Sequence, residues 1–436
     1  MRGDQDYPVS FEQESIWVAE RFSGGPSPFI ESWAQRLRGQ LDIDAMTWAL
    51  RQIAIRHPAL RSRFLLVGDR LVQRVSPDAD LVVERADWRQ ANLAEALRGA
   101  AQRPLDIREA TFRAGLFELA ADDHILLVQC HHIVVDDHSF DLLSAEIKAL
   151  YTSAVSGGSP DLAAPAISPG EYATRQRARG VSAESLDYWT RYLDGAQPPR
   201  ELPPAGRPLP PRRSTRCGRV TAAIDGDVAR AIRTSARAMR TTPTVIFLAS
   251  LTMALAASVG VADVVFAQPV SRRGSAELED VFGCFTDVLP VRLNAFPSTA
   301  FSELCGATKR SVISALTHRD VPWAAIVKRL NTPKDALSGG GLLRVAMVIE
   351  EATELTLPGL ECERVYIVPA AVKFDWHVYV VAGKGDYGCY ADYASDYFSP
   401  DQAALALRQL TRTFAEVTAD PGLTVAGLRQ TLGSTA

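Results

Sequence analysis

Apolar side chains recur at helical spacing in some parts of the chain and form continuous runs in others. Residues 10–20 are predicted to be a helix, with Ser10 as its N-cap and Gln13 at the capping-box position. Residues 43–56 and 140–154 each carry one apolar stripe, as amphipathic helices do. Residues 125–131 are too continuously apolar for a half-exposed strand, so we expect this strand to lie inside a sheet.

The second half of the chain alternates strands with helices. Strands are predicted at residues 220–224, 264–267, 288–293, 343–349 and 376–381. Helices are predicted at residues 228–239, 301–316 and 400–419. The pattern of both halves indicates an α/β or α+β fold in two lobes.

Residues 245–262 form an 18-residue run without a charge, which is long enough to span a bilayer. Four small or polar residues interrupt this run: Ser250, Thr252, Ser258 and Gly260. Thr242 followed by Pro243 is typical of a helix N-cap and a first-turn proline. We therefore predict a buried core helix at residues 244–258, followed by a short strand, and no membrane association.

The clearest boundary is rich in proline. The stretch from Gly195 to Arg213 reads GAQPPRELPPAGRPLPPRR, which can sustain neither a helix nor an inner strand. Proline at this density favours an extended, semi-rigid connector. The predicted division is therefore a first lobe at residues 1–195, a connector at 196–213 and a second lobe at 214–436.

Composition excludes several classes of protein. The 436 residues are 47% hydrophobic and 22% charged, with a net charge of -4, so a folded protein is expected rather than a disordered one. Without a basic excess, a nucleic-acid partner is not expected. The six cysteines include no C-x-x-C pair, and the N-terminus lacks the apolar core of a secretory signal. These features indicate buried thiols in a reducing cytoplasm.

Three of the seven histidines fall in one segment, Cys130-His-His-Ile-Val-Val-Asp-Asp-His-Ser-Phe140. His131 and His132 end the predicted inner strand, where successive side chains point to opposite faces, so one should pack and the other be presented. Asp136, in the turn before the next helix, can cap that helix or pair with a cation. A presented neutral imidazole can accept a proton near neutral pH. A metal site is not expected, because adjacent residues rarely converge on one ion; a purely structural histidine pair stays open.

The segment His131-His132-x-x-x-Asp136 resembles the HHxxxDG motif of nonribosomal peptide synthetase condensation domains, which belong to the chloramphenicol-acetyltransferase-like superfamily. Other segments resemble further motifs of that family, in its order. They are Ser10–Trp17 with Glu12 in place of alanine, Arg56–Phe64 with Pro58 in place of glutamate, Tyr172-Ala173, Phe282–Arg292 and His318–Trp323. The resemblance covers the chain from about Tyr7 to its C-terminus.

The resemblance implies a two-lobed pseudo-dimer of acyltransferase-like units, with the active site in a tunnel between the lobes. Carrier proteins would deliver phosphopantetheine-bound substrates, and an acceptor amine or alcohol would attack the donor thioester. His132 would lie at the reaction centre, as a general base or to position the nucleophile. His131 and Asp136 would mainly support the loop.

The resemblance also suggests partners and tunnel residues. Asp136 would pair with an arginine across the fold, for which Arg292, Arg61 and Arg63 are the candidates. Ser139 would either line the tunnel or cap the helix. The second lobe would contribute backbone around Arg344–Val348, including Met347, and around Gly283, Cys284, Phe285 and Thr286; for each of these side chains, packing is the alternative to substrate contact.

The chain departs from the family at Asp137, where the family has glycine. This carboxylate could attract an ammonium acceptor, raise the pKa of the catalytic histidine or narrow the tunnel. It could equally point away as the helix N-cap.

The expected function is amide or ester formation in natural-product or antibiotic biosynthesis. No adenylation or carrier domain is recognised, so the chain itself is expected to bind no cofactor. A peptidyl or acyl carrier protein is expected in trans, with a small-molecule or carrier-bound acceptor, and Met1 favours a stand-alone enzyme. The alternatives are a catalytically silent docking module, although such relatives usually lose the second histidine, and an acyltransferase that uses free coenzyme A.

Overall fold

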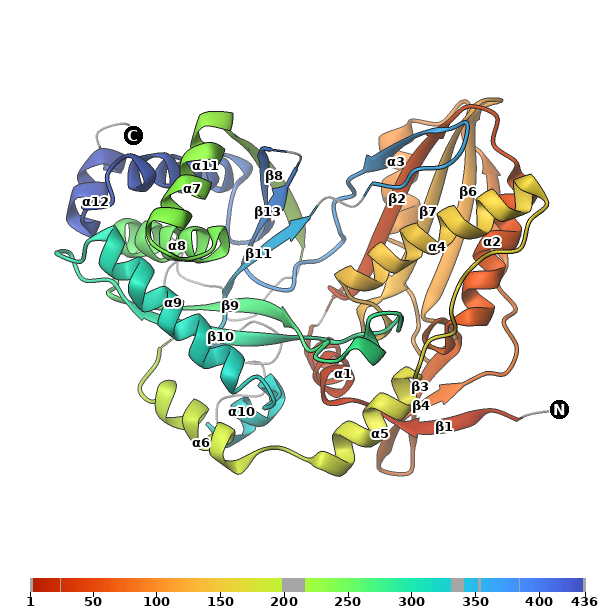
Figure 1. Ribbon diagram of the computed structural model, residues 1–436, viewed down its shortest axis with the longest axis horizontal. Coiled ribbons are helices and arrows are strands. Elements are labelled where there is room, and N and C mark those ends of the chain that lie inside the picture. The colour runs from red at the N-terminus through yellow and green to blue at the C-terminus, as the bar shows by residue number, and fades with distance from the viewer. Residues whose placement is uncertain are drawn as a thin grey trace.

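The computed structural model describes residues 3–23, 25–197, 216–330, 341–351, 354–383 and 385–433. It has two lobes that meet along one side (Figure 1), each a sheet covered by helices on both faces. The predicted two-lobed α/β class is confirmed. Most of the predicted connector, from residue 198 onward, lies outside the described residues, so the division at 196–213 stays a prediction.

The first lobe is built on a five-stranded sheet with the order β12-β2-β7-β6-β5, beside a three-stranded sheet with the order β1-β4-β3. Its elements are β1 (Gln5–Pro8), α1 (Phe11–Phe22), β2 (Ile30–Arg38), α2 (Ile43–Arg56), β3 (Ser62–Val67), β4 (Arg70–Val75), β5 (Val83–Asp87), α3 (Leu93–Ala101), β6 (Phe112–Ala120), β7 (Asp123–His131), α4 (Asp137–Ser156) and α5 (Pro169–Arg179). The next helix, α6 (Ala183–Tyr192), packs on the second lobe.

The central strand β7 is apolar on both sides because helices cover both sides of its sheet. Leu126 and Val128 pack in the core formed with α2 and α4, whereas Ile125 and Leu127 pack against α3. The prediction of an inner strand here is confirmed, although it begins at Asp123. The predicted helix at residues 43–56 is α2, with the same bounds.

The second lobe has a six-stranded sheet with the order β10-β9-β11-β13-β14-β8. Its elements are β8 (Cys217–Ile224), α7 (Gly226–Ala238), α8 (Pro243–Val259), β9 (Asp263–Ser271), β10 (Thr286–Asn294), α9 (Phe301–Thr317), α10 (Trp323–Arg329), β11 (Val345–Glu351), β13 (Trp376–Ala382), β14 (Tyr387–Ala394), α11 (Pro400–Ala419) and α12 (Val425–Gly433). Helices α6 and α10 cover the other face of this sheet.

The uncharged run is the central helix α8 of the second lobe. Thr242 is its N-cap, Pro243 its first residue, and every residue from Val245 to Ala257 is buried, so the predicted core helix is confirmed. Across the described ranges, no single helix has the length and apolar composition of a membrane span; α7 and α8 pass only as a pair, bent by 105°.

One strand crosses from the second half of the chain into the first lobe. Strand β12 (Glu361–Val365) pairs antiparallel with β2, from Glu361 opposite Arg38 to Val365 opposite Ala34. Figure 1 shows this blue segment at the edge of the first-lobe sheet. The end of the β9–β10 hairpin also reaches the first lobe, beside α1. These two crossings bring residues of both lobes to one cavity.

Candidate active site

The end of strand β7 directs the two adjacent histidines to opposite sides. His131 is fully buried: its Nε2 lies 3.1 Å from Glu20 Oε1, and its Nδ1 accepts a hydrogen bond of 3.2 Å from the Ile133 backbone. His132 begins a short 3-10 turn, residues His132–Val134, and its side chain lines the cavity between the lobes. The predicted contrast between a packed and a presented histidine is confirmed.

The hydrogen bonding of His132 defines its tautomer. Its Nδ1 lies 2.7 Å from the Val135 carbonyl oxygen, which can only accept, so Nδ1 carries the proton and Nε2 keeps its lone pair. Burial lowers the pKa of His132 to about 4; the Lys373 ammonium lowers it further, and the Glu31 carboxylate opposes both. At neutral pH, His132 is therefore an uncharged imidazole able to accept a hydrogen bond.

Asp136 joins the two lobes beneath this histidine. Its carboxylate caps α4 by accepting from the Ser139 backbone at 2.9 Å, and it forms a buried ion pair with Arg273 at 2.9 Å. It also accepts a hydrogen bond from the Phe285 backbone at 3.2 Å. Ser139 is the third residue of the α4 capping box, where its Oγ accepts from the Asp136 backbone at 3.4 Å, so of its two predicted roles the capping one is found. The Gly283 backbone also donates to this Oγ at 3.1 Å.

The predicted arginine partners of Asp136 are wrong. Arg292 pairs with Asp263 at 2.8 Å, Arg63 pairs with Asp4 at 3.0 Å, and Arg61 donates to backbone carbonyl groups. The partner is Arg273, which follows β9 at the tip of the hairpin that reaches the first lobe. Its position depends on where that hairpin ends in space, which the spacing of motifs along the chain does not give.

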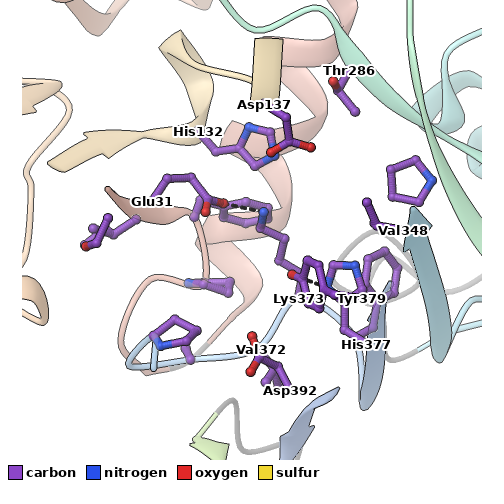
Figure 2. A pocket seen from close by; sticks show the side chains of 18 of the residues that line it. Glu31, His132, Asp137, Thr286, Val348, Val372, Lys373, His377, Tyr379 and Asp392 are labelled. Atoms are coloured by element: carbon purple, nitrogen blue, oxygen red, sulfur yellow. Dashed lines mark hydrogen bonds and ion pairs between the residues drawn. The ribbon is translucent and has the colours of Figure 1, made fainter. Parts of the chain in front are cut away.

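The cavity has a volume of about 240 Å³ and is lined by residues of both lobes. Figure 2 shows His132 and Asp137 of the first lobe facing Thr286, Val348, His377 and Tyr379 of the second. The predictions that Asp137 and Thr286 line the cavity agree with the structure.

The remaining predicted tunnel residues are not among the described residues that line the cavity. Gly283 is bonded to Ser139, Cys284 is buried with its Sγ 3.9 Å from His132 Nδ1, and Phe285 packs against Tyr172 and the Arg273 guanidinium. Met347 is fully buried in the second-lobe core. Its neighbour Val348 faces the cavity instead, because successive residues of a strand point to opposite faces.

Asp137 is not the N-cap of α4, which is Asp136; it is the first residue of the helix. In Figure 2 its carboxyl group lies beside the His132 imidazole at the cavity wall. Partial removal from water at the cavity wall raises the pKa of Asp137 to about 7, with further contributions from the Glu350 and Glu31 carboxylates and an opposing one from Lys373. Where the family motif has glycine, this chain therefore has a carboxyl group that titrates near neutrality.

A polar wall of the cavity was missed at the level of sequence. Glu31 of β2 forms an ion pair with Lys373, which precedes β13; burial raises the pKa of Glu31, but the ammonium outweighs it and brings that pKa to about 2. His377 Nδ1 lies 2.8 Å from the Tyr379 hydroxyl, in the same wall. His377 and Tyr379 lie two residues apart on a strand that is otherwise apolar, so they point to the same face. This spacing is the sequence signal that could have indicated a polar cavity wall.

The second part of this wall comes from β8 and β14. Arg219 forms a buried ion pair with Asp392 at 2.6 Å and lies over the Tyr390 ring. The Tyr390 ring stacks on Tyr379 with their centroids 4.5 Å apart. The cavity thus offers charged and hydroxyl groups on the second-lobe side, opposite His132 and Asp137.

The family model of the condensation domain matches residues 4–432. The chain is 30% identical over 446 residues to the phosphinothricin tripeptide synthetase PhsC of Streptomyces viridochromogenes, covering 98% of this chain and 41% of that protein. It is also 30% identical to malpinin synthetase of Mortierella alpina, covering 85% of this chain. The chain spans only 5% of malpinin synthetase and 16% of the nonribosomal peptide synthetase asqK of Emericella nidulans.

Solved structures share the fold over nearly the whole chain. The X-domain in complex with OxyB from teicoplanin biosynthesis is 26% identical, with a TM-score of 0.85 over 98% of this chain and 96% of that one. The SgcC5 protein of Streptomyces globisporus is 20% identical, with a TM-score of 0.78 over 96% of this chain and 100% of that one. These matches confirm the expected two-lobed acyltransferase-like fold.

Proposed function

Because the chain belongs to the condensation-domain family, we propose that it is an acyl-transferring condensation enzyme of natural-product biosynthesis. An acceptor amine or alcohol attacks an acyl or aminoacyl thioester held on a carrier protein, and an amide or ester forms. The observation that supports this proposal is the neutral imidazole of His132, held through Nδ1 with its Nε2 lone pair available in a cavity between two lobes.

The role of His132 follows from its environment. A pKa of about 4 makes it a weak base before substrates bind, so its first action is to accept a hydrogen bond from the nucleophile and orient it. When the nucleophile attacks the thioester carbonyl, negative charge develops on the carbonyl oxygen. An imidazolium formed at that moment is stabilised by the nearby oxyanion, so proton transfer to Nε2 becomes favourable as the tetrahedral intermediate forms. The proton then passes to the departing pantetheine thiolate.

Members of this family work with carrier proteins, and we propose that a peptidyl or acyl carrier protein delivers the donor in trans. The phosphopantetheine arm would then belong to that partner and enter the cavity only with its substrate. The acceptor is a small molecule or a second carrier-bound group. We place this activity in the cytoplasm.

The test is product formation from acyl- and aminoacyl-loaded carrier proteins, with coenzyme A thioesters as a separate donor arm, and a panel of amine and alcohol acceptors. We expect His132→Ala to lower the rate by about 10²–10⁴-fold. His138→Ala is the matched control: His138 lies in the same segment, but its Nε2 is 2.7 Å from the Glu279 carbonyl oxygen and it does not line the cavity. Equal rates for His132→Ala and the wild-type protein would contradict the assigned role.

A silent docking module is the second candidate. Two observations favour it: Asp137 stands where the family motif has glycine, and a similar fold occurs in an X-domain that forms a complex with OxyB. This candidate predicts tight binding of a carrier protein or tailoring enzyme with no turnover of any donor and acceptor pair. Turnover that depends on His132 would exclude it.

A further inference from the structure

Among the described carboxylates that line the cavity, Asp137 differs from Glu12, Glu31, Asp287, Glu350 and Asp392 in having no hydrogen-bond or ion-pair partner. Its side chain is exposed to the cavity, whereas that of the preceding Asp136 is buried and paired with Arg273. In the part of the chain that the structure describes, no group donates a hydrogen bond to the Asp137 carboxyl or forms an ion pair with it. A carboxyl group without a partner, beside the His132 imidazole, is a place for a ligand group that carries protons (Figure 2).

The charges that act on Asp137 are mostly negative. Glu350 of β11, Glu31 of β2 and Asp136 of its own segment all disfavour its ionised form, and the Lys373 ammonium favours it. Lys373 is itself paired with Glu31. Arg364 of β12 also lines the cavity, but it acts on Glu350. This end of the cavity therefore favours the entry of a cation, such as the ammonium form of an acceptor amine.

We propose that Asp137 is a further catalytic residue, which receives the acceptor amine as an ammonium ion and takes one proton from it beside His132. This proposal rests on the proposed condensation function and narrows its acceptor to an amine. It assigns to this chain a base that the glycine of the family motif cannot supply.

The ammonium gives one proton to the Asp137 carboxylate, and the nitrogen lone pair is freed. That lone pair forms the C–N bond to the thioester carbonyl carbon, and His132 Nε2 takes the second proton. The C–S bond breaks, the thiolate takes the proton held by His132, and Asp137 releases its proton to water. The products are an amide, a thiol and one proton.

The proton affinities suit this step. An α-ammonium group has an ordinary pKa of about 7.7–8.0, so transfer to an ordinary aspartate, with a pKa of about 3.9, would be uphill by about four orders of magnitude. Partial removal of Asp137 from water, together with its acidic neighbours, raises its pKa to about 7, so the pKa values of proton donor and proton acceptor become similar. His132, with a pKa of about 4, is much less suited to remove the first proton.

The first test needs no turnover. Aspartate labelled with carbon-13 is followed by NMR during a pH titration, and the Asp137 signal is the one absent from Asp137→Asn. We expect its midpoint near pH 7, and a shift downward of about one unit or more with n-propylammonium chloride, since a cation favours the carboxylate. Neutral n-propanol should leave the midpoint unchanged. A midpoint near 4, or the same response to both additives, would overturn the proposal.

The second test uses the pH dependence of single-turnover amide formation with glycinamide as the acceptor and an N-acetylcysteamine thioester as the donor. The wild-type rate should rise with pH through about pH 7. Asp137→Asn and Asp137→Gly should not show this rise, and their rates at pH 7 should be lower by about tenfold or more. Asp137→Glu should recover part of the lost rate. Asp69→Asn makes the same chemical change at an exposed turn between β3 and β4, away from the cavity; it is the matched control and should keep the wild-type profile.

The two proposals fail in different ways. One outcome is that His132→Ala is impaired while Asp137→Asn keeps the wild-type rate and the rise in rate near pH 7. The catalytic role of Asp137 is then wrong, and the proposed condensation activity is unaffected. If Asp137→Gly is faster than the wild-type protein at every pH, Asp137 narrows the cavity and is not a base. If His132→Ala is as active as the wild-type protein, the proposed mechanism itself fails, whatever the titration of Asp137 shows.

Discussion

Two neighbouring aspartates have opposite environments, and this difference organises the site. Asp136 accepts hydrogen bonds from both lobes and pairs with Arg273, with both side chains almost fully buried. Asp137 has its carboxyl group in the cavity beside His132. Two consecutive residues at the start of α4 therefore differ in role: the Asp136 carboxylate joins the lobes, whereas the Asp137 carboxyl group is accessible to a ligand.

Removing Arg273 should destabilise the protein strongly. Arg273→Met leaves the Asp136 carboxylate buried without its cation, which costs about 3–5 kcal/mol of the free energy of unfolding. Arg63→Met, whose ion pair with Asp4 is exposed, is the control and should cost about 0–1 kcal/mol. Urea denaturation measures both values; similar small losses in the two variants would contradict the structural role of the Asp136–Arg273 pair.

The stability of the protein should also depend on Asp137 and pH. Its folded-state pKa of about 7 lies above its unfolded value, so the folded protein holds this proton more tightly. Its contribution to stability is therefore fully present below about pH 4 and is lost as the pH rises through 7. We expect Asp137→Asn to gain in melting temperature relative to the wild-type protein between pH 5 and pH 8. A difference that is constant across this range would show that the pKa of Asp137 is not raised.

At the level of residues, the sequence predicts the centre of the site better than its walls. His131, His132 and Asp136 are adjacent in the chain, so the end of one strand and the start of one helix place them together. The Arg273 partner and the wall of Glu31, Lys373 and His377 come from distant segments that meet only in the folded protein. Because these segments are far apart in the sequence, no local sequence pattern indicates that their side chains meet.

Helix α1 connects its own N-cap to the histidine loop. Ser10 and Gln13 form a capping box, as predicted, and the Gln13 side chain donates to the Ile133 carbonyl oxygen at 3.2 Å. Gln13 also bonds Gln73 of β4. The start of α1 therefore supports the turn that presents His132.

Ser10→Ala should cost about 1 kcal/mol of stability, because one helix donor loses its acceptor, and it should also reduce acyl transfer. Ser399→Ala is the matched control, since Ser399 forms the same capping box with Gln402 at the exposed start of α11. We expect a stability loss in both variants and a loss of kcat only in Ser10→Ala, measured by denaturation and by product formation. A loss of kcat in both variants would mean that activity follows stability alone.

Helices with a clear periodicity of apolar residues are predicted well from the sequence, whereas polar or short strands are not. The helices α2 and α11 have the predicted bounds, because their stripes or their caps are explicit in the sequence. Strand β2 carries Glu31, Gln35 and Arg36 among its apolar residues and was not predicted. Strand β12 has the sequence ECERV, which lacks an apolar pattern. It forms a strand because it pairs with β2 in the other lobe, and the sequence does not indicate that pairing.

At the scale of the molecule, the lobes depend on each other. Strand β12 completes the first-lobe sheet, and ion pairs cross between the lobes, among them Asp136–Arg273, Glu12–Arg272 and Glu31–Lys373. Each of these pairs lies at or beside the cavity. The cavity that holds His132 and Asp137 therefore exists only when both lobes are folded and in contact.

Thermal unfolding should occur in a single transition, because unfolding either lobe removes strand pairing and ion partners from the other. Calorimetry of the wild-type protein tests this expectation. Two separate transitions, with β12 released in the first, would show that the lobes are independent. Arg273→Met should lower the temperature of the transition, since it removes one of the crossing contacts.

The central claim is that His132 acts on the reacting atoms. It is tested most directly by rapid-quench single-turnover measurement of amide formation from a carrier-bound donor, comparing the wild-type protein, His132→Ala and His138→Ala. We predict that His132→Ala slows the chemical step by about 10²–10⁴-fold and that His138→Ala keeps the wild-type rate. A single-turnover rate for His132→Ala equal to that of the wild-type protein would contradict this account.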